Sequence, residues 1–362
     1  MGSRKIALYT HALAGGGAER AFAVLASGLA QRGHDVLFVT DYAAPENESF
    51  LDPLVRRIEL GHGHLRATRN LMELLAREKP DVSISALGAG NVKHAAAATL
   101  AGRRRRAILT CHGFFASEPR PLSQLSFLLA PVLTRITGRT IAVSNALREN
   151  LIKSWRASPS RTCYVQNPVQ QRTPREMPTE QSLRLRQPNI LACGRLTPEK
   201  NFIGLLHAFA KMTRRDARLI ILGEGEERSA LEATVAKLGL SNRVELPGYV
   251  AEPWAYYETA ACLAVSSRSE SFGMVIVEAL SQGLPVVATD CGGPREILNS
   301  PGIGRLVPID DGAALTAGLD AALANPGDPN PRLARAETFS LKRGIDAYEK
   351  LIDEVVTENA VH

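Results

Sequence analysis

In the first half of the chain, two patterns of apolar and polar residues alternate. Short apolar runs are separated by longer stretches in which apolar residues recur every three or four positions. The short runs predict strands and the longer stretches predict helices. The predicted strands are residues 5–10, 36–40, 82–85, 107–110, 140–143 and 162–165, and the predicted helices are residues 18–31, 67–78, 92–100, 122–137 and 145–155.

The second half repeats the pattern after a break at residues 170–188, where Pro174, Pro178 and Pro188 stand among polar residues and indicate a linker. The later strands are predicted at residues 189–193, 217–222, 244–246, 263–266 and 285–288, and the later helices at residues 202–213, 228–238, 254–261, 273–282 and 341–356. Such alternation predicts parallel, doubly wound sheets. We therefore expect two α/β domains, residues 1–169 and 170–340, with a ligand in the cleft between them at the carboxyl ends of both sheets.

The composition supports two ordinary soluble domains. The chain has 362 residues, of which 45% are hydrophobic and 22% are charged. No apolar stretch reaches the roughly 18 residues of a membrane span, and the first residues are interpreted as a strand and not as a signal peptide. The five cysteines are scattered without metal-ligand spacing, which is typical of reduced thiols in a cytoplasmic protein.

The net charge of +6 favours an anionic partner. Nucleic acid is disfavoured because the chain has no nucleic-acid motif, which leaves a phosphorylated ligand or an anionic membrane face. Four consecutive cations, Arg103–Arg106, and the apolar helix predicted at residues 122–137 could form a membrane-facing patch, in which each cation would contribute about 1 kcal/mol. The alternative is a solvated loop beside a core helix.

Two carboxylates, Glu270 and Glu278, flank a Ser-Phe-Gly turn and the start of an apolar helix. A carboxylate inside such a helix needs hydrogen-bonding partners, because burying it alone is unfavourable. The helix N-terminus between the two acids favours a diphosphate. The alternatives are a partly exposed helix carboxylate for Glu278 and a helix N-terminal charge for Glu270.

Two cations follow the strand predicted at residues 189–193. Gly194 allows a tight turn, Arg195 supplies a planar fork of donors, and Lys200 supplies a point charge just before a helix. This combination suits a pyrophosphate group. A solvated strand–helix loop is the alternative.

These residues resemble the signature of retaining glycosyltransferases that have two facing Rossmann-like domains, the GT-B architecture, and most closely glycosyltransferase family 4. The resemblance implies that Arg195 and Lys200 hold the donor diphosphate and that Glu278 binds the ribose hydroxyls. It implies that Glu270 contacts the donor sugar, with nearby backbone amides of Ser271, Phe272 and Gly273. Ser271 stands where many members have glycine, a departure that keeps the backbone amide.

Three further segments belong to the implied donor site. Gly223, in a Gly-Glu-Gly turn followed by Arg228, is placed near the diphosphate, and Leu246 and Val250 are placed beside the nucleotide base. Tight turns and ordinary strand residues are the alternatives. In the first half, Gly16 and Gly17 belong to a glycine-rich loop that the resemblance places opposite the donor, and a flexible turn is the alternative.

His112 follows the strand predicted at residues 107–110, and the resemblance places it near the donor sugar or the acceptor. It completes the candidate catalytic set with Arg195, Lys200 and Glu270, although a strand-end histidine is often only a satisfied polar residue. Ser144 precedes a predicted helix, where capping is the favoured interpretation.

The implied reaction is a retaining transfer, without metal or cofactor, from a nucleotide-diphosphate donor to a glycan or lipid-linked acceptor. The resemblance favours a UDP-sugar, a bacterial polysaccharide or lipopolysaccharide pathway, and a cytoplasmic enzyme at the inner membrane face. It also implies that the C-terminal helix, about residues 341–362, packs back on the acceptor-binding first domain. Loops at residues 42–50, 61–68 and 114–121 are the expected acceptor contacts. The alternatives are a nucleotide-sugar epimerase of the same architecture and a non-catalytic nucleotide-sugar-binding protein.

Overall fold

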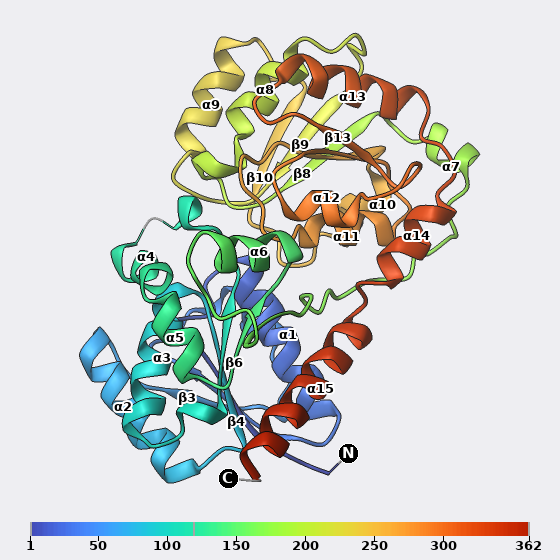
Figure 1. Cartoon of the computed structure of the whole chain (residues 1–362). Coiled ribbons are helices and arrows are strands. Elements are labelled where there is room, and N and C mark those ends of the chain that lie inside the picture. The colour runs from blue at the N-terminus through green and yellow to red at the C-terminus, as the bar shows by residue number, and fades with distance from the viewer. Residues whose placement is uncertain (1, 119, 361–362) are drawn as a thin grey trace. The chain divides into compact units, whose positions relative to one another are not determined.

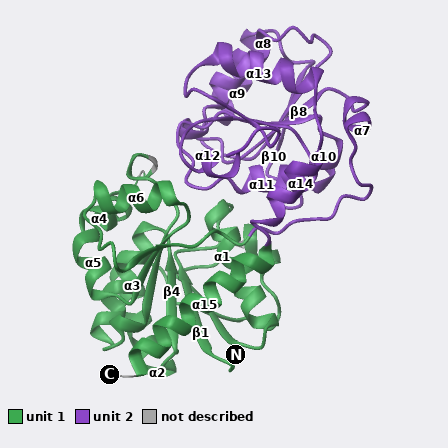
Figure 2. Ribbon diagram, turned by 45° about the vertical axis from the view of Figure 1, so that its right-hand side comes forward, with its two compact units in different colours: residues 1–168, 341–362 green, residues 169–340 purple. Residues whose placement is uncertain are grey.

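A computed structural model describes residues 2–118 and 120–360 (Figure 1). The chain forms two compact units, which are coloured separately in Figure 2. Unit 1 consists of Met1–Pro168 and Leu341–His362, and unit 2 consists of Val169–Ser340. The units therefore divide one residue before the boundary expected from the linker composition.

Unit 1 contains a parallel seven-stranded sheet in the order β3-β2-β1-β4-β5-β6-β7. Its strands are β1 (Lys5–Thr10), β2 (Asp35–Thr40), β3 (Arg56–Glu59), β4 (Val82–Ala86), β5 (Ala107–Cys111), β6 (Arg139–Ala142) and β7 (Thr162–Tyr164). Its helices are α1 (Gly17–Gln31), α2 (His64–Glu78), α3 (Gly88–Leu100), α4 (Pro121–Leu128), α5 (Ala130–Ile136), α6 (Asn145–Lys153) and α15 (Leu341–Ala360), with short 3-10 turns η1 (Pro45–Phe50), η2 (Arg104–Arg106) and η3 (Phe115–Ser117).

Side chains of the central strand β1 are divided between two cores, because successive residues of a strand point to opposite faces. Ile6 and Leu8 pack with α1 and α15. Ala7 and Tyr9 pack with α2 and α3 on the other face. Helices on both faces explain why β1 is apolar from Ile6 to Tyr9. They also place the C-terminal helix α15 in the core of unit 1.

The prediction of one continuous helix at residues 122–137 is wrong. The structure has two helices, α4 and α5, that are separated at Leu129. Pro131 lies in the first turn of α5, where a backbone N–H has no partner within the helix, so proline loses no hydrogen bond there. In a helix interior the same ring would break the series of backbone hydrogen bonds.

Unit 2 contains a parallel six-stranded sheet in the order β10-β9-β8-β11-β12-β13. Its strands are β8 (Asn189–Cys193), β9 (Arg218–Leu222), β10 (Val244–Gly248), β11 (Cys262–Val265), β12 (Val286–Thr289) and β13 (Arg305–Val307). Its helices are α7 (Glu180–Arg184), α8 (Phe202–Ala210), α9 (Arg228–Lys237), α10 (Trp254–Thr259), α11 (Met274–Ser281), α12 (Gly293–Ile297), α13 (Gly312–Ala324) and α14 (Asn330–Glu337), with a 3-10 turn η4 (Pro198–Lys200). Helices α8, α9 and α13 cover one face of the sheet, and α10 and α11 lie at the other (Figure 1).

The strand order of each sheet reverses at one point. In unit 1 the reversal lies between β1 and β4, and in unit 2 it lies between β8 and β11. Loops leaving the carboxyl ends of the two strands diverge there, which opens a place for a ligand. Within the described parts of the chain, none of the helices combines the length and apolar character needed to span a bilayer.

Candidate functional site

The loop after β8 begins the candidate site in unit 2 and lies against the loop after β9. Leu196 N–H donates to the carbonyl of Glu224 at 2.9 Å, and Gly223 N–H donates to the carbonyl of Gly248 at 2.8 Å. A Cβ atom on Gly223 would lie 1.9 Å from the carbonyl oxygen of Gly194. Glycine is therefore required for this approach of two backbones, and Gly223 supports the loop that carries the two cations.

Arg195 and Lys200 differ in their surroundings. Arg195 is exposed, and within residues 2–118 and 120–360 no hydrogen bond or ion pair holds its guanidinium. Lys200 Nζ lies 2.5 Å from Glu270 Oε2, and both side chains are largely shielded from solvent. Two residues predicted to bind the donor, Lys200 and Glu270, thus form a direct ion pair, and a third, Arg195, is available to bind an anion.

The Lys200–Glu270 pair sits where the strand order of unit 2 reverses. Lys200 ends η4 on the loop after β8, and Glu270 lies on the loop after β11. Ser266 Oγ donates to the carbonyl of Lys200 at 2.8 Å. Arg268 N–H donates to the carbonyl of Glu199 at 2.7 Å. These bonds fix the two loops to each other, so the ion pair has a rigid base.

Sequence analysis missed a third segment, Gly292-Gly293, which supports Glu270 from the loop after β12. Glu270 and Gly292 form a parallel bridge, and Gly293 N–H donates to the carbonyl of Glu270 at 2.7 Å. A Cβ atom on Gly293 would lie 2.4 Å from the carbonyl oxygen of Phe272. Two glycines and a proline that open a helix directly after an apolar strand were the signal for this segment.

Gly273 precedes α11 with a φ of +104°, which favours glycine. Because the helix begins at Met274, its first N–H groups lie beside the Ser271–Gly273 turn, and such groups attract negative charge. Phe272 is buried and packs edge-on against Phe339. The turn therefore presents backbone and not the Phe272 ring at the helix start.

Glu278 is only 1% exposed, so its interpretation as a partly exposed helix carboxylate is wrong. Tyr257 on α10 donates its hydroxyl hydrogen to Glu278 Oε2 at 2.8 Å. Burial raises the pKa of Tyr257, with the neighbouring Cys193 and Glu278 adding to the effect, so the phenol keeps its proton and remains a donor. Cys193 is the last residue of β8, which places the buried carboxylate near the base of the Gly194 loop.

The segment predicted to flank a base lies at the end of β10. Leu246 packs on the core of unit 2, and Val250 is half-buried beyond the strand. Arg228 binds the carboxylates of Glu224 and Glu232 and the carbonyl of Leu246 at 2.6–2.9 Å. Arg228 therefore fastens the β9 loop to β10, and Leu246 serves the core at least in part.

In unit 1, the predicted glycine-rich loop follows β1 and opens α1. Gly16 is buried at the N-cap of α1, and Gly17 is its exposed first residue. Asn47 on η1 donates its side-chain amide to the carbonyl of Ala14 at 2.7 Å. The loop is thus anchored by η1, which argues against the interpretation as a flexible turn.

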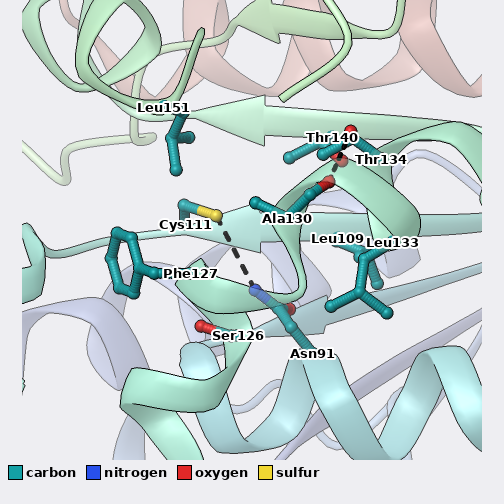
Figure 3. A pocket seen from close by; sticks show the side chains of 10 residues that line it. All are labelled: Asn91, Leu109, Cys111, Ser126, Phe127, Ala130, Leu133, Thr134, Thr140 and Leu151. Carbon is teal, nitrogen blue, oxygen red and sulfur yellow. Dashed lines mark hydrogen bonds between the residues drawn. The ribbon is translucent and has the colours of Figure 1, made fainter. Parts of the chain in front are cut away.

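His112 follows β5, and both of its ring nitrogens are shielded from solvent. Burial lowers its pKa to about 4, so the imidazole is neutral near pH 7. Cys111 beside it borders a small, largely apolar cavity under α4 and α5, where Asn91 donates to its sulfur (Figure 3). His112 therefore lies at the edge of the core, and its surroundings are not those of an accessible general base.

Ser144 accepts a hydrogen bond from Leu147 N–H at 3.2 Å, so its interpretation as a helix cap is confirmed. Among the residues that the structure describes, no group of three or more His, Cys, Asp or Glu side chains is arranged to hold a metal ion. The chemistry visible in unit 2 is an accessible guanidinium, a Lys–Glu pair and a helix start, which together suit an anion joined to a hydroxyl-rich group.

Two protein-family models match complementary parts of the chain. The model for Glycosyl transferases group 1 matches residues 175–338. The model for Glycosyltransferase Family 4 matches residues 15–171. One model thus lies within unit 2, and the other covers most of the N-terminal part of unit 1.

Curated relatives align over parts of the chain. An uncharacterised glycosyltransferase of Methanocaldococcus jannaschii is 42% identical over 29% of this chain and 27% of its own length. The N-acetylgalactosamine-N,N'-diacetylbacillosaminyl-diphospho-undecaprenol 4-alpha-N-acetylgalactosaminyltransferase of Campylobacter jejuni is 29% identical over 56% of this chain and 54% of its own length. The lipopolysaccharide core biosynthesis glycosyltransferase LpsE of Rhizobium meliloti is 31% identical over 46% and 49%. The chain therefore spans between 27% and 54% of the length of these relatives.

Solved structures match nearly the whole chain. A glycosyltransferase of Rickettsia africae has a TM-score of 0.80 at 20% identity and covers 98% of this chain and 99% of its own. HepE of Anabaena, solved with UDP-glucose, has a TM-score of 0.77 at 20% identity and covers 99% and 100%. These matches confirm the fold class predicted from the sequence, two Rossmann-like parallel-sheet domains. The chain belongs to the family 4 glycosyltransferases of the group 1 type and has their GT-B fold.

Proposed function

We propose that the protein is a retaining glycosyltransferase that moves a sugar from a nucleotide-diphosphate donor, a UDP-sugar, to a hydroxyl group of a glycan or lipid-linked acceptor. The observation that carries the proposal is the Lys200–Glu270 ion pair beside an accessible Arg195. A nucleotide-sugar carries a diphosphate next to a ring of hydroxyls. Arg195 and Lys200 can bind the diphosphate as cations, and Glu270 can accept hydrogen bonds from the hydroxyls.

Donor binding would rearrange this pair. Lys200 Nζ turns from Glu270 to the diphosphate, together with Arg195 and the first N–H groups of α11. Glu270 then accepts hydrogen bonds from the sugar hydroxyls. The buried Glu278 is assigned to the ribose, which requires the Tyr257 hydroxyl to share that carboxylate with the ligand.

In the reaction, the sugar–phosphate bond breaks and its electron pair stays on the diphosphate. The acceptor oxygen bonds to the anomeric carbon from the same face, and its proton passes to an oxygen of the departing phosphate. Negative charge grows on the diphosphate as the bond lengthens, so Arg195 and Lys200 bind the transition state more strongly than the ground state. We propose that these cations take the place of a metal ion.

The proposed pathway is bacterial surface polysaccharide or lipopolysaccharide synthesis. Support comes from the relatives named above for lipopolysaccharide core and for diphospho-undecaprenol substrates. His112 keeps a proposed place near the transferred sugar, as a neutral hydrogen-bonding group and not as a base.

A donor panel tests the proposal. UDP- and GDP-sugars are incubated with the protein, alone and with octyl glycosides of glucose, galactose, N-acetylglucosamine and N-acetylgalactosamine, and nucleotide release is measured together with product NMR. Release of UDP that rises with an acceptor, with an α-linked product from an α-linked donor, is expected. An epimerised sugar without an acceptor would identify an epimerase, and nucleotide binding without turnover would identify a non-catalytic binding protein.

Unit 1 also exposes an apolar surface that supports the proposed membrane contact. Leu128 and Val132 on α4 and α5 are 62% and 54% exposed. Arg105 donates to the carbonyl of Arg135 at 2.9 Å, which brings two exposed cations to the end of the same surface. Of the four-arginine run, Arg103 and Arg106 instead donate to the carbonyls of Pro80 and Asp81. Only part of that run is therefore available to lipid headgroups.

Replacing both Leu128 and Val132 with glutamate is expected to lower binding to vesicles of phosphatidylglycerol and phosphatidylcholine by at least about fivefold, because it removes apolar contact and adds repulsion from anionic lipid. Co-sedimentation measures the bound fraction. The control is Leu185→Glu, a single apolar-to-glutamate change at an exposed leucine of unit 2. Equal binding by the double variant and the control would show that α4 and α5 do not contact lipid.

A further inference from the structure

A cluster of polar side chains occupies the point in unit 1 where the strand order reverses. His11 follows β1, Asp41 follows β2, and Lys93 lies on α3 after β4. Tyr9 in β1 completes the cluster. These four residues are not among those implied by the family resemblance, yet their place in unit 1 corresponds to the place of the Lys200–Glu270 pair in unit 2.

Asp41 is the centre of this cluster. Its carboxylate, 2% exposed, accepts hydrogen bonds from the Tyr9 hydroxyl at 2.8 Å and from His11 Nδ1 at 2.6 Å, and it forms an ion pair with Lys93, which is 3% exposed. Burial raises the pKa of the carboxyl, but the bonds from His11, Lys93 and Tyr9 outweigh it and the pKa of Asp41 is lowered. A buried charge pair with this many bonds is rigid, so it can hold the attached imidazole in one orientation.

The orientation of His11 leaves one ring nitrogen available. A distance of 2.6 Å from a carboxylate oxygen requires a proton on Nδ1, because two lone pairs would repel at that separation. Within the described ranges no hydrogen bond reaches Nε2, and the side chain is 24% exposed. His11 is therefore a fixed ring whose Nε2 atom can bind a ligand hydroxyl.

Two aromatic rings lie near the His11 ring, and a third stacks on one of them. The Tyr42 ring lies edge-on to His11 with the centroids 5.0 Å apart, and it stacks on His62 at 5.2 Å. The His64 ring lies 6.0 Å from His11. Tyr42 also lines a small cavity at the ends of β2 and β3, whose lining includes Glu48, Arg57 and Glu59.

We propose that this region is the acceptor subsite and that His11 Nε2 accepts a hydrogen bond from a non-reacting hydroxyl of a neutral acceptor sugar, with Asp41 and Lys93 as positioning residues. Aromatic faces pack against the C–H faces of a sugar ring, and the cavity supplies further hydrogen-bonding groups. This inference rests on the proposed function, because a sugar acceptor is needed only if the protein transfers sugar.

The charges of the region favour a neutral ligand over an anionic one. Asp41 and Lys93 balance each other, and the two carboxylates of the cavity exceed its single arginine. A phosphate or uronic acid would meet this excess of negative charge. A neutral hydroxyl-bearing ring meets hydrogen-bonding groups of both kinds.

The test compares His11→Ala and His11→Gln with wild type. The Gln side chain can place an oxygen near the position of Nε2. His11→Ala is expected to raise the KM for the best octyl glycoside about 10-fold, with kcat and acceptor-free UDP release changed less than about threefold, as for loss of one hydrogen bond. His11→Gln is expected to recover most of the loss. Saturation-transfer NMR of the same glycoside in the presence of UDP should show contact with wild type and a weaker signal with His11→Ala.

His207→Ala, at an exposed histidine of α8 in unit 2, is the matched control and should resemble wild type in every measurement. An unchanged KM in His11→Ala, or a loss of kcat that His11→Gln does not restore, would overturn the proposal, the second because it would indicate a general base. Failure of wild type to bind any of the glycosides would also overturn it. If acceptor-free UDP release is absent as well, the proposed function itself fails.

Discussion

Replacing Arg195 or Lys200 with alanine is expected to lower the turnover of the UDP-sugar by about 100-fold or more. In the proposed reaction each cation faces the charge that grows on the departing diphosphate, and removal of one such group typically costs two or three powers of ten in rate. UDP release at saturating donor measures the effect. Lys200→Ala also leaves Glu270 without its ion-pair partner, so its donor affinity should change more than that of Arg195→Ala.

Lys237→Ala is the control, since Lys237 is an exposed lysine in the last turn of α9. It should retain wild-type turnover. The double variant Lys200→Ala/Glu270→Ala tests the coupling of the pair, and its loss should be smaller than the product of the two single losses. Turnover near the wild-type rate in both Arg195→Ala and Lys200→Ala would remove the proposed mechanism.

Replacing Gly223 with valine is expected to reduce UDP affinity by about 100-fold or more and to lower the thermal midpoint of unfolding by about 5–10 °C. The new Cβ would lie 1.9 Å from the Gly194 carbonyl, and the φ of +143° disfavours a branched side chain. The β8 loop must move away, which displaces Arg195 and Lys200. Titration calorimetry with UDP and thermal unfolding measure the two effects.

Gly239→Ala separates backbone strain from loop displacement. Gly239 also has a positive φ, +67°, but no atom lies within 4 Å of the position of its Cβ. This variant should lose about 1–2 kcal/mol of stability and keep wild-type UDP affinity. If Gly223→Val also kept that affinity, the contact between the two loops would not support the site.

Most strands of both sheets could be predicted because they are largely buried and contain a short run of mainly apolar residues. The strands that sequence analysis missed, β3 and β13, lie at sheet edges and contain arginine. Charged residues are common on edge strands, where they discourage pairing with other chains, and they remove the apolar run on which a prediction depends. Helix α13 had a legible signal, since Asp311 caps it before a run rich in alanine and leucine.

The sequence could predict which residues belong to the site, but not which of their side chains contact each other. Glycines and cations after a strand indicate an anion site wherever the fold brings them together, so Arg195 and Lys200 could be proposed from local sequence. The contact between Lys200 and Glu270 joins residues 70 positions apart, and that between Lys93 and Asp41 joins residues 52 apart. Such contacts depend on strand order, which local patterns do not specify.

The ion pair between Lys200 and Glu270 has a consequence for the release of the nucleotide product. In the proposed donor complex, both partners keep a binding partner when the pair separates, because the Lys200 ammonium binds the diphosphate and the Glu270 carboxylate binds the sugar hydroxyls. Free UDP can bind only Lys200, and it leaves the Glu270 carboxylate without a counter-ion or a sugar hydroxyl to bind. Under the proposed function, we therefore expect re-formation of the pair after transfer to favour release of UDP and to favour binding of the intact donor over UDP.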